Sequence, residues 1–229
     1  MDDVASVQIG LFEATHSARA LRRFRPDPVP DELITRVLDT AVRGPSASGG
    51  QNWIFVVVKD PAVRARIGEI YRESSRVVQA EYAERAKPAH LGDRQYELMK
   101  KSSSYLFEHM ADAPVLIVAA LKLGAPGSRH SPLSREDEIA RFWRTSGASI
   151  YPAIQNLILA CRALGLGTVL TTIHTYHEGA MKAALGLPAD AYTYALMPVG
   201  WPLDKFGPIK RRPLGEVAFR DRWGNSWAG

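Results

Sequence analysis

Two short, continuous apolar runs constrain the fold of this chain more than any other feature. They are Ile54-Phe55-Val56-Val57-Val58 and the segment from Ala113 to Leu121. Both are far shorter than the roughly 20 apolar residues that a membrane-spanning helix needs. An unbroken apolar run of this length is typical of a β-strand that is buried on both faces. The sequence therefore predicts a buried central sheet with other elements packed against it.

Helical periodicity distinguishes several segments from these strands. Asp60-Pro61 and Gly186 are typical of a helix start and a helix end. We expect helices over residues 4–20, from 31 to about 43, from 61 to 71 and on with breaks into the charged stretch 81–101, over about 154–164, and over 178–185. Further strands are expected at 168–172 and 192–198, and a long loop at 122–138.

Length and composition indicate an ordinary globular protein. With 229 residues the chain can bury a full core, and we expect one domain over residues 1–229, with possible excursions at about 74–112 and 122–147. The acidic start Met1-Asp2-Asp3 lacks a signal pattern, so we predict a cytoplasmic protein with no membrane segment. The net charge of +5 comes from basic residues scattered among acids, which argues against a nucleic-acid partner.

Several common functional sites are absent from the sequence. Neither G-x-x-x-x-G-K-[ST] nor G-x-G-x-x-G is present, and Ser46 is not in a G-x-S-x-G turn because position 48 is also serine. Cys161 is the only cysteine, which excludes an intrachain disulfide, and we predict it to be a core residue. His174 and His177 have the spacing of two ligands on a helix, but no third ligand is indicated. We therefore expect surface histidines and no metal site.

The loop from Gly44 to Trp53 carries the first binding signal. Its sequence is Gly-Pro-Ser-Ala-Ser-Gly-Gly-Gln-Asn-Trp. Gly49 and Gly50 lack a Cβ, so backbone N–H groups there can approach a flat ligand closely. The same residue types also make an ordinary connection between a helix and a strand. The loop alone leaves both interpretations open.

Two basic pairs carry the second signal. Arg19 and Arg22 are three residues apart and share a face if the first helix continues that far. Lys210 and Arg212 are two apart, so in an extended segment they point to the same side. A phosphate dianion needs several converging donors, which arginine and lysine supply. Each pair by itself is more typical of a solvated basic patch.

Three separated stretches together resemble the FMN-dependent nitroreductases. Arg19-Ala20-Leu21-Arg22-Arg23-Phe24, with Pro28-Val29-Pro30, looks like the family's segment R-S-x-R-x-F…P-V. Pro45-Ser46 through Gln51-Asn52-Trp53 is similar to P-S-x-x-N-x-Q-P-W. Lys210-Arg211-Arg212-Pro213-Leu214 resembles K-x-R-x-P-L, and Gly165-Leu166-Gly167 lies at the usual place between. The resemblance spans residues 19–217, most of the chain.

The resemblance implies where FMN would bind. Arg19, Arg22, Lys210 and Arg212 would hold the ribityl phosphate, with Ala20 and Pro45 in the same binding segments. Ser46 and Gln51 would contact the ribityl chain or the pyrimidine edge, and Leu170, Thr171 and Thr172 would run along the isoalloxazine near N1 and N5. Three positions depart from the pattern: Ala20 replaces serine, Gly49 replaces asparagine, and Asn52, which would partly compensate, replaces proline.

The expected fold is α+β, with a mixed, mainly antiparallel sheet between helices, and the resemblance implies an intertwined homodimer with two FMN sites at its interface. The tail 200–229 fits this arrangement. Its aromatic residues, Trp201, Phe206, Phe219, Trp223 and Trp227, occur without the periodicity that a separate core would need. Their exposure would be costly in a monomer, so we predict that the tail crosses onto a second subunit.

The implied activity is transfer of a hydride from NADH or NADPH, through bound FMN, to a small electron acceptor such as a nitroaromatic or a quinone. FMN supplies the redox chemistry, so no catalytic side chain is predicted. The same fold also serves reductive dehalogenases, enone or diketopiperazine reductases and a flavin-degrading enzyme of cobalamin biosynthesis, and a non-catalytic flavin-binding protein is a further alternative. A hydroxyl of Thr171 or Thr172 beside N5 would favour the one-electron chemistry of dehalogenation, although both residues are also good strand formers.

Overall fold

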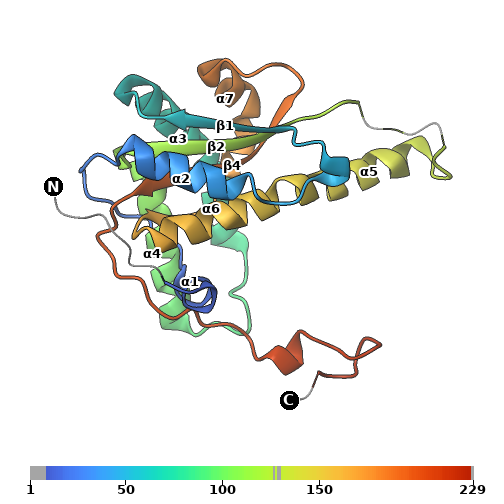
Figure 1. Cartoon of the computed structure of the whole chain (residues 1–229). Coiled ribbons are helices and arrows are strands. Elements are labelled where there is room, and N and C mark those ends of the chain that lie inside the picture. Colours follow the sequence, from blue (N-terminus) through green and yellow to red (C-terminus); the bar gives the residue numbers. More distant parts are fainter. Residues whose placement is uncertain (1–8, 126, 128–129, 228–229) are drawn as a thin grey trace.

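The computed structural model describes residues 9–125, 127 and 130–227. Its helices are α1 (Leu11–Ser17), α2 (Asp31–Ala41), α3 (Pro61–Glu84), α4 (Asp93–His109), α5 (Arg135–Ser146), α6 (Tyr151–Ala163) and α7 (Glu178–Leu185). Its strands are β1 (Trp53–Val58), β2 (Val115–Lys122), β3 (Gly167–Thr168) and β4 (Ala191–Gly200). Figure 1 shows the strands in the middle of the molecule, with helices on both faces of the sheet.

The strands form one sheet in the order β1-β2-β4-β3, and every strand pairing among the described residues is antiparallel. Val118 of β2 stands opposite Val56 of β1 on one side and Leu196 of β4 on the other. The predicted α+β fold with a mainly antiparallel sheet between helices is therefore confirmed.

Strand β2 divides the core into two parts, because its side chains alternate between the two faces of the sheet. Val115, Ile117 and Ala119 pack with α2 and α6. Leu116 and Val118 pack with α3, α4 and α7. All five side chains are fully buried. The predicted burial of this strand on both faces is thus confirmed.

The same expectation is wrong for residues 54–58. Strand β1 lies at the edge of the sheet, and its residues from Trp53 to Val57 are only partly buried, whereas Val58 is buried. An edge strand has a neighbour on one side only, so its apolar side chains are covered less completely. Apolar content alone does not distinguish an edge strand from a central one.

Three element boundaries also differ from the prediction. The first helix ends at Ser17, so Arg19 and Arg22 are not on it. Residues 4–8, which were also predicted to be helical, lie outside the described residues. The expected loop 122–138 ends early, because the Ser134 hydroxyl accepts a hydrogen bond from Asp137 N and starts α5. The strand expected at 168–172 consists of β3 followed by an isolated bridge from Thr171 to Leu196.

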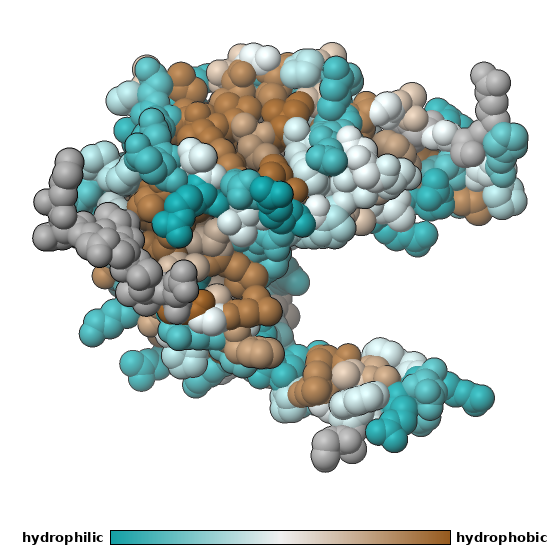
Figure 2. Space-filling model, in the orientation of Figure 1, coloured by the Kyte–Doolittle hydropathy of each residue, from teal (hydrophilic) through white to brown (hydrophobic). Residues whose placement is uncertain are grey.

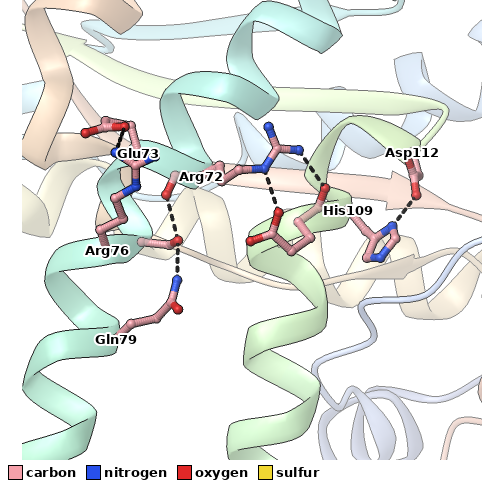
Figure 3. A network of polar contacts seen from close by, with 8 residues as sticks. Arg72, Glu73, Arg76, Gln79, His109 and Asp112 are labelled. Carbon is pink, nitrogen blue, oxygen red and sulfur yellow. Dashed lines mark hydrogen bonds and ion pairs between the residues drawn. The ribbon is translucent and has the colours of Figure 1, made fainter.

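A polar network joins α3 to α4 (Figure 3). Arg72 Nε lies 2.7 Å from Glu108 Oε2, and Arg72 Nη2 donates to the Glu108 carbonyl at 3.1 Å. Helix α3 is continuous over Pro61–Glu84, where the sequence predicted breaks. Arg72 therefore links α3 and α4, the two helices that form one wall of the cavity described below.

After β4 the chain forms two further segments, which we call the strap (residues 201–210) and the arm (residues 214–227). The strap runs antiparallel to residues 16–25: Arg25 N donates to Trp201 O at 2.8 Å, and Ile209 N donates to His16 O at 3.0 Å. The arm stands away from the body of the molecule (Figure 1) and exposes apolar side chains (Figure 2). Trp223 on the arm is 88% exposed.

None of the helices in the described part of the chain combines the length and the apolar character that a membrane crossing requires.

Gly44 provides a test of the packing between α2 and α6. A Cβ at this buried residue would lie 2.8 Å from Ala153 N and 3.0 Å from Ala153 Cα, both backbone atoms. We expect Gly44→Ala to lower the free energy of unfolding by about 1–3 kcal/mol. Gly179 in α7 has no atom within 4 Å of such a Cβ, so Gly179→Ala should raise it by about 0.5–1 kcal/mol. Urea unfolding measures both, and equal effects would contradict this packing.

Candidate functional site

A cavity of about 200 Å³ lies between α3, α4 and the segment that follows β3. Four of the residues assigned to FMN by resemblance line it: Arg22, Leu170, Thr171 and Thr172. The fold thus brings the N-terminal basic segment together with the chain after the Gly165-Leu166-Gly167 turn. The backbone contact that joins them is Leu21 N donating to Thr168 O at 3.1 Å.

Among the described residues that line this cavity, Arg22 is the only arginine or lysine. Its Nη1 donates to Ser102 Oγ at 3.1 Å, a neutral partner, and no carboxylate pairs with it in the described part of the chain. Burial lowers the pKa of Arg22 and the nearby charge of Arg19 lowers it further, whereas Tyr71 and Tyr82 act in the opposite direction. Arginine nevertheless stays protonated. The cavity therefore holds a positive charge at a cost that a bound anion would reduce.

Arg23, the next residue, points elsewhere. Its Nε lies 3.0 Å from Asp204 Oδ2 on the strap, and its Nη2 contacts Asp204 Oδ1. The expectation that Arg19 and Arg22 share a helical face is wrong, because α1 ends at Ser17. Arg22 and Arg23 differ instead in their partners, Ser102 and Asp204.

Two tyrosines on α3 were not predicted from sequence. Tyr71 and Tyr82 line the cavity beside Arg22. Burial raises the pKa of Tyr71 to about 12, while its hydrogen bond to Thr171 acts in the opposite direction. They stand at i and i+11, which places both on one face of a continuous helix. The spacing of the two tyrosines is visible in the sequence. It places them on one face only if the helix is continuous, whereas the sequence predicted breaks after residue 71.

The two threonines after β3 have different surroundings. Thr171 Oγ1 donates to the Leu196 carbonyl at 2.9 Å, so its hydroxyl proton is held by β4. Thr172 is exposed at the cavity, and its carbonyl accepts from the Thr175 hydroxyl at 2.7 Å. Thr172 is therefore better placed than Thr171 to offer a hydroxyl to a ligand.

The other predicted cations lie near the end of α1 and along the tail. Arg19 is exposed, and its charge is felt by both Arg22 and Asp204. Lys210 follows Ile209, whose N–H binds the His16 carbonyl. Lys210 and Arg212 line a separate cavity of about 910 Å³, and Arg212 pairs with Glu216 at 3.0 Å. Ala20 is exposed and offers no hydroxyl.

The loop of Pro45, Ser46 and Gln51 is tightly turned. Ser48 (φ 53°), Gly49 (φ 65°) and Gln51 (φ 46°) all have positive φ, which is uncommon outside glycine. Ser46 Oγ accepts from Gln51 N at 3.1 Å, which holds the turn closed. Asn52 Nδ2 donates to the Lys122 carbonyl at 2.6 Å, so this amide anchors the end of β1 in the single chain.

This loop lies far from the cavity of Arg22. Ala47 N donates to Ser149 Oγ at 3.0 Å, at the start of α6, whereas Arg162 Nε near the end of α6 lies 2.7 Å from Ser17 Oγ of α1. Ser149 and Arg162 are separated by about 20 Å at the rise of an α-helix. Figure 1 likewise shows the loop between α2 and β1 at the α5 end of the molecule, away from α1. One chain does not bring the two predicted groups together.

Cys161 and the two histidines, His174 and His177, can now be compared with their predicted burial. Cys161 is fully buried, as predicted, and burial raises the pKa of its thiol to about 12. The prediction of surface histidines is wrong for His174, which is fully buried with its pKa lowered to about 4 by burial. His177 Nδ1 lies 2.9 Å from Ser74 Oγ. No cluster of three potential metal ligands occurs among the residues that the structure describes.

Comparison with known proteins gives two kinds of relatives. The chain is 31% identical over 213 residues to an NADH dehydrogenase of Thermus thermophilus, covering 87% of this chain and 90% of that one. It is 29% identical over 209 residues to human iodotyrosine deiodinase 1, covering 90% of this chain and 66% of the relative.

Solved structures agree on the fold. An iodotyrosine deiodinase bound to FMN and 3-iodo-L-tyrosine superposes with a TM-score of 0.65 at 23% identity, covering 93% of this chain and 99% of that one. A BluB-like flavoprotein from Clostridium difficile 630 superposes with a TM-score of 0.69 at 22% identity, covering 93% and 100%. The model of the nitroreductase family matches residues 16–201, from the end of α1 to the start of the strap. This chain therefore belongs to the nitroreductase family.

Proposed function

We propose that this protein is an FMN-dependent oxidoreductase that accepts hydride from NADH or NADPH and reduces a small molecule such as a nitroaromatic or a quinone. Family membership supports oxidoreductase chemistry. The Thermus relative is named an NADH dehydrogenase, and a nitroreductase of Desulfitobacterium hafniense of the same fold has been solved with FMN bound. The proposed electron donor, acceptor and cofactor are supported by these relatives and by the residues of the site.

The observation that carries the proposal is the cavity lined by Arg22 and by residues 170–172. Arg22 offers a partly buried cation whose one hydrogen-bond partner among the described residues is the Ser102 hydroxyl, which suits the phosphate of FMN. Arg19 would add a second positive charge to the phosphate. Leu170, Thr171 and Thr172 would lie along the ring system and exclude water from it. The bound FMN would supply the redox chemistry, so the chain's own task is binding and orientation.

We infer that the complete site forms between two copies of the chain. A volume of about 200 Å³ accommodates only part of an FMN, and the loop of Ser46 and Gln51 lies at the other end of α6. A second copy related by twofold symmetry can bring its own loop to this cavity, so two chains would make two sites. The exposed arm, with Trp223 and Trp227, would then be covered by the partner.

Reductive dehalogenation is the second candidate. The specific observation in its favour is the similarity to iodotyrosine deiodinase 1 from human and other animals, which extends over 90% of this chain. Thr172, exposed at the cavity, is the residue that would offer a hydroxyl to the flavin ring. Enone reduction, flavin degradation and flavin binding without turnover have no comparable observation in their favour.

The first test of function is anaerobic mixing of the FMN-loaded protein with NADH or NADPH. We expect fast loss of the visible flavin absorption with at least one of the two donors, followed by recovery when a quinone or a nitroaromatic is added. Iodide release from an iodophenol, with no recovery on quinone addition, would instead favour dehalogenation. A protein that binds FMN but is reduced by neither donor would contradict the proposed electron transfer.

The second test compares two neighbouring arginines. Removing a charged contact to phosphate costs about 1.5–3 kcal/mol, so Arg22→Ala should weaken FMN binding by about ten- to a hundredfold. Arg23→Ala is the matched control, because exposed Arg23 pairs with partly buried Asp204 on the strap and such surface pairs contribute about 0–1 kcal/mol. Fluorescence titration gives both affinities. Equal losses in the two variants would contradict the assignment of Arg22.

The third test removes the arm. A chain that ends at Pro213 keeps the strap, Lys210 and Arg212, and lacks only residues 214–229. If the arm holds the dimer, folding, association and FMN retention are linked, and the shortened chain should lose dimer and flavin together. Light scattering combined with flavin absorbance measures both. A folded monomer that retains FMN would show that one chain makes a complete site, against the proposal.

A further inference from the structure

Arg162, near the end of α6, is largely buried and touches two segments that are far apart in the sequence. Its side chain is 14% exposed. Nε lies 2.7 Å from Ser17 Oγ, and Nη2 lies 3.4 Å from Glu13 Oε1, both on α1. The guanidinium carbon lies 4.3 Å from the centre of the Phe206 ring on the strap. One side chain therefore ties α6 to the end of α1 and to the strap.

The hydrogen bond between Arg162 and Ser17 has a defined donor and acceptor. The Ser17 hydroxyl donates its proton to the Glu13 carbonyl at 2.6 Å, so its oxygen is left to accept from Arg162. A planar guanidinium can donate to this oxygen through one edge while its face stacks on the Phe206 ring. The ammonium group of lysine has no face to stack, so it cannot reproduce both contacts together.

The two segments that Arg162 joins carry the cations proposed for phosphate. Ser17 stands two residues before Arg19, and Phe206 stands four before Lys210. Beside this junction the strap and α1 share the backbone hydrogen bond from Ile209 N to His16 O, at 3.0 Å. Arg162 itself is occupied by Ser17, Glu13 and Phe206 and does not line the cavity of Arg22. Its effect on a ligand must act through these neighbours.

We propose that Arg162 is a positioning residue for the phosphate of the flavin: it holds the end of α1 beside the strap, so that Arg19 and Lys210 present their charges to one phosphate group. The inference rests on the proposed FMN binding and extends it. A purely structural role would affect all flavins alike, whereas this role predicts an effect on the ligand that carries a phosphate. Loss of Arg162 should weaken recognition of the phosphate and leave recognition of the ring system intact, because residues 170–172 are not held by Arg162.

The test compares FMN with riboflavin, which has the same ring and ribityl chain but no phosphate. For Arg162→Ala we expect an approximately tenfold loss of FMN affinity, the size of one charged contact. Riboflavin affinity should stay unchanged. Arg162→Lys should recover only part of the loss. Phe206→Leu removes the stacking partner alone and should give a smaller loss with the same selectivity, which keeps the test valid should Arg162→Ala fold poorly.

Arg64→Ala is the matched control. Arg64 on α3 is also a structural arginine, whose Nη1 donates to the carbonyls of Ala111 at 2.8 Å and Ala113 at 2.7 Å, neither of which belongs to α1 or the strap. Its loss should not change the ratio of FMN to riboflavin affinity. The inference is overturned if the Arg162 and Phe206 variants lose both ligands equally, or lose neither. A wild-type protein that binds riboflavin and FMN equally well overturns the proposed phosphate site, and the role of Arg162 with it.

Discussion

The antiparallel pairing of β2 with β4 is the constraint on which the rest of the structure depends. Both strands are almost entirely buried, so their backbone polar groups can be satisfied only by neighbouring strands. Helices α2 and α6 cover one face and α3, α4 and α7 cover the other, which leaves no room for polar chemistry on the sheet itself. The charged residues assigned to the candidate site consequently lie outside the sheet, on the segment after α1 and on the tail after β4.

Those segments divide the candidate site into two halves. The segment after β3 and Arg22 line one cavity together with Tyr71 and Tyr82 of α3. The loop of Ser46 and Gln51 is held instead at the start of α6 by Ser149. Because the loop and the cavity lie near opposite ends of α6, which is about 20 Å long, the proposed site would need two chains to be complete. An exposed arm and a divided site have the same explanation if two chains assemble.

Much of this arrangement follows from the sequence, and the exceptions have physical causes. The burial of β2 follows from its apolar run, and α2 from its stripe of Leu33, Ile34 and Val37. Sequence does not reveal that β1 lies at an edge, because strand order depends on long-range pairing. The burial of Arg22 depends on α3 and α4, which begin 39 and 71 residues further along the chain. The start of α5 is an exception of another kind, because Ser134 followed by Asp137 is a capping pattern that the sequence itself carries.

The flavin content of the purified protein tests the central claim most directly. The full chain, incubated with excess FMN and freed of unbound ligand by gel filtration, should retain one FMN per chain of 25.2 kDa and elute with the mass of two chains. Retention of FMN by a species of that mass would support a site built from two copies around Arg22. Elution of folded protein without flavin would contradict the account.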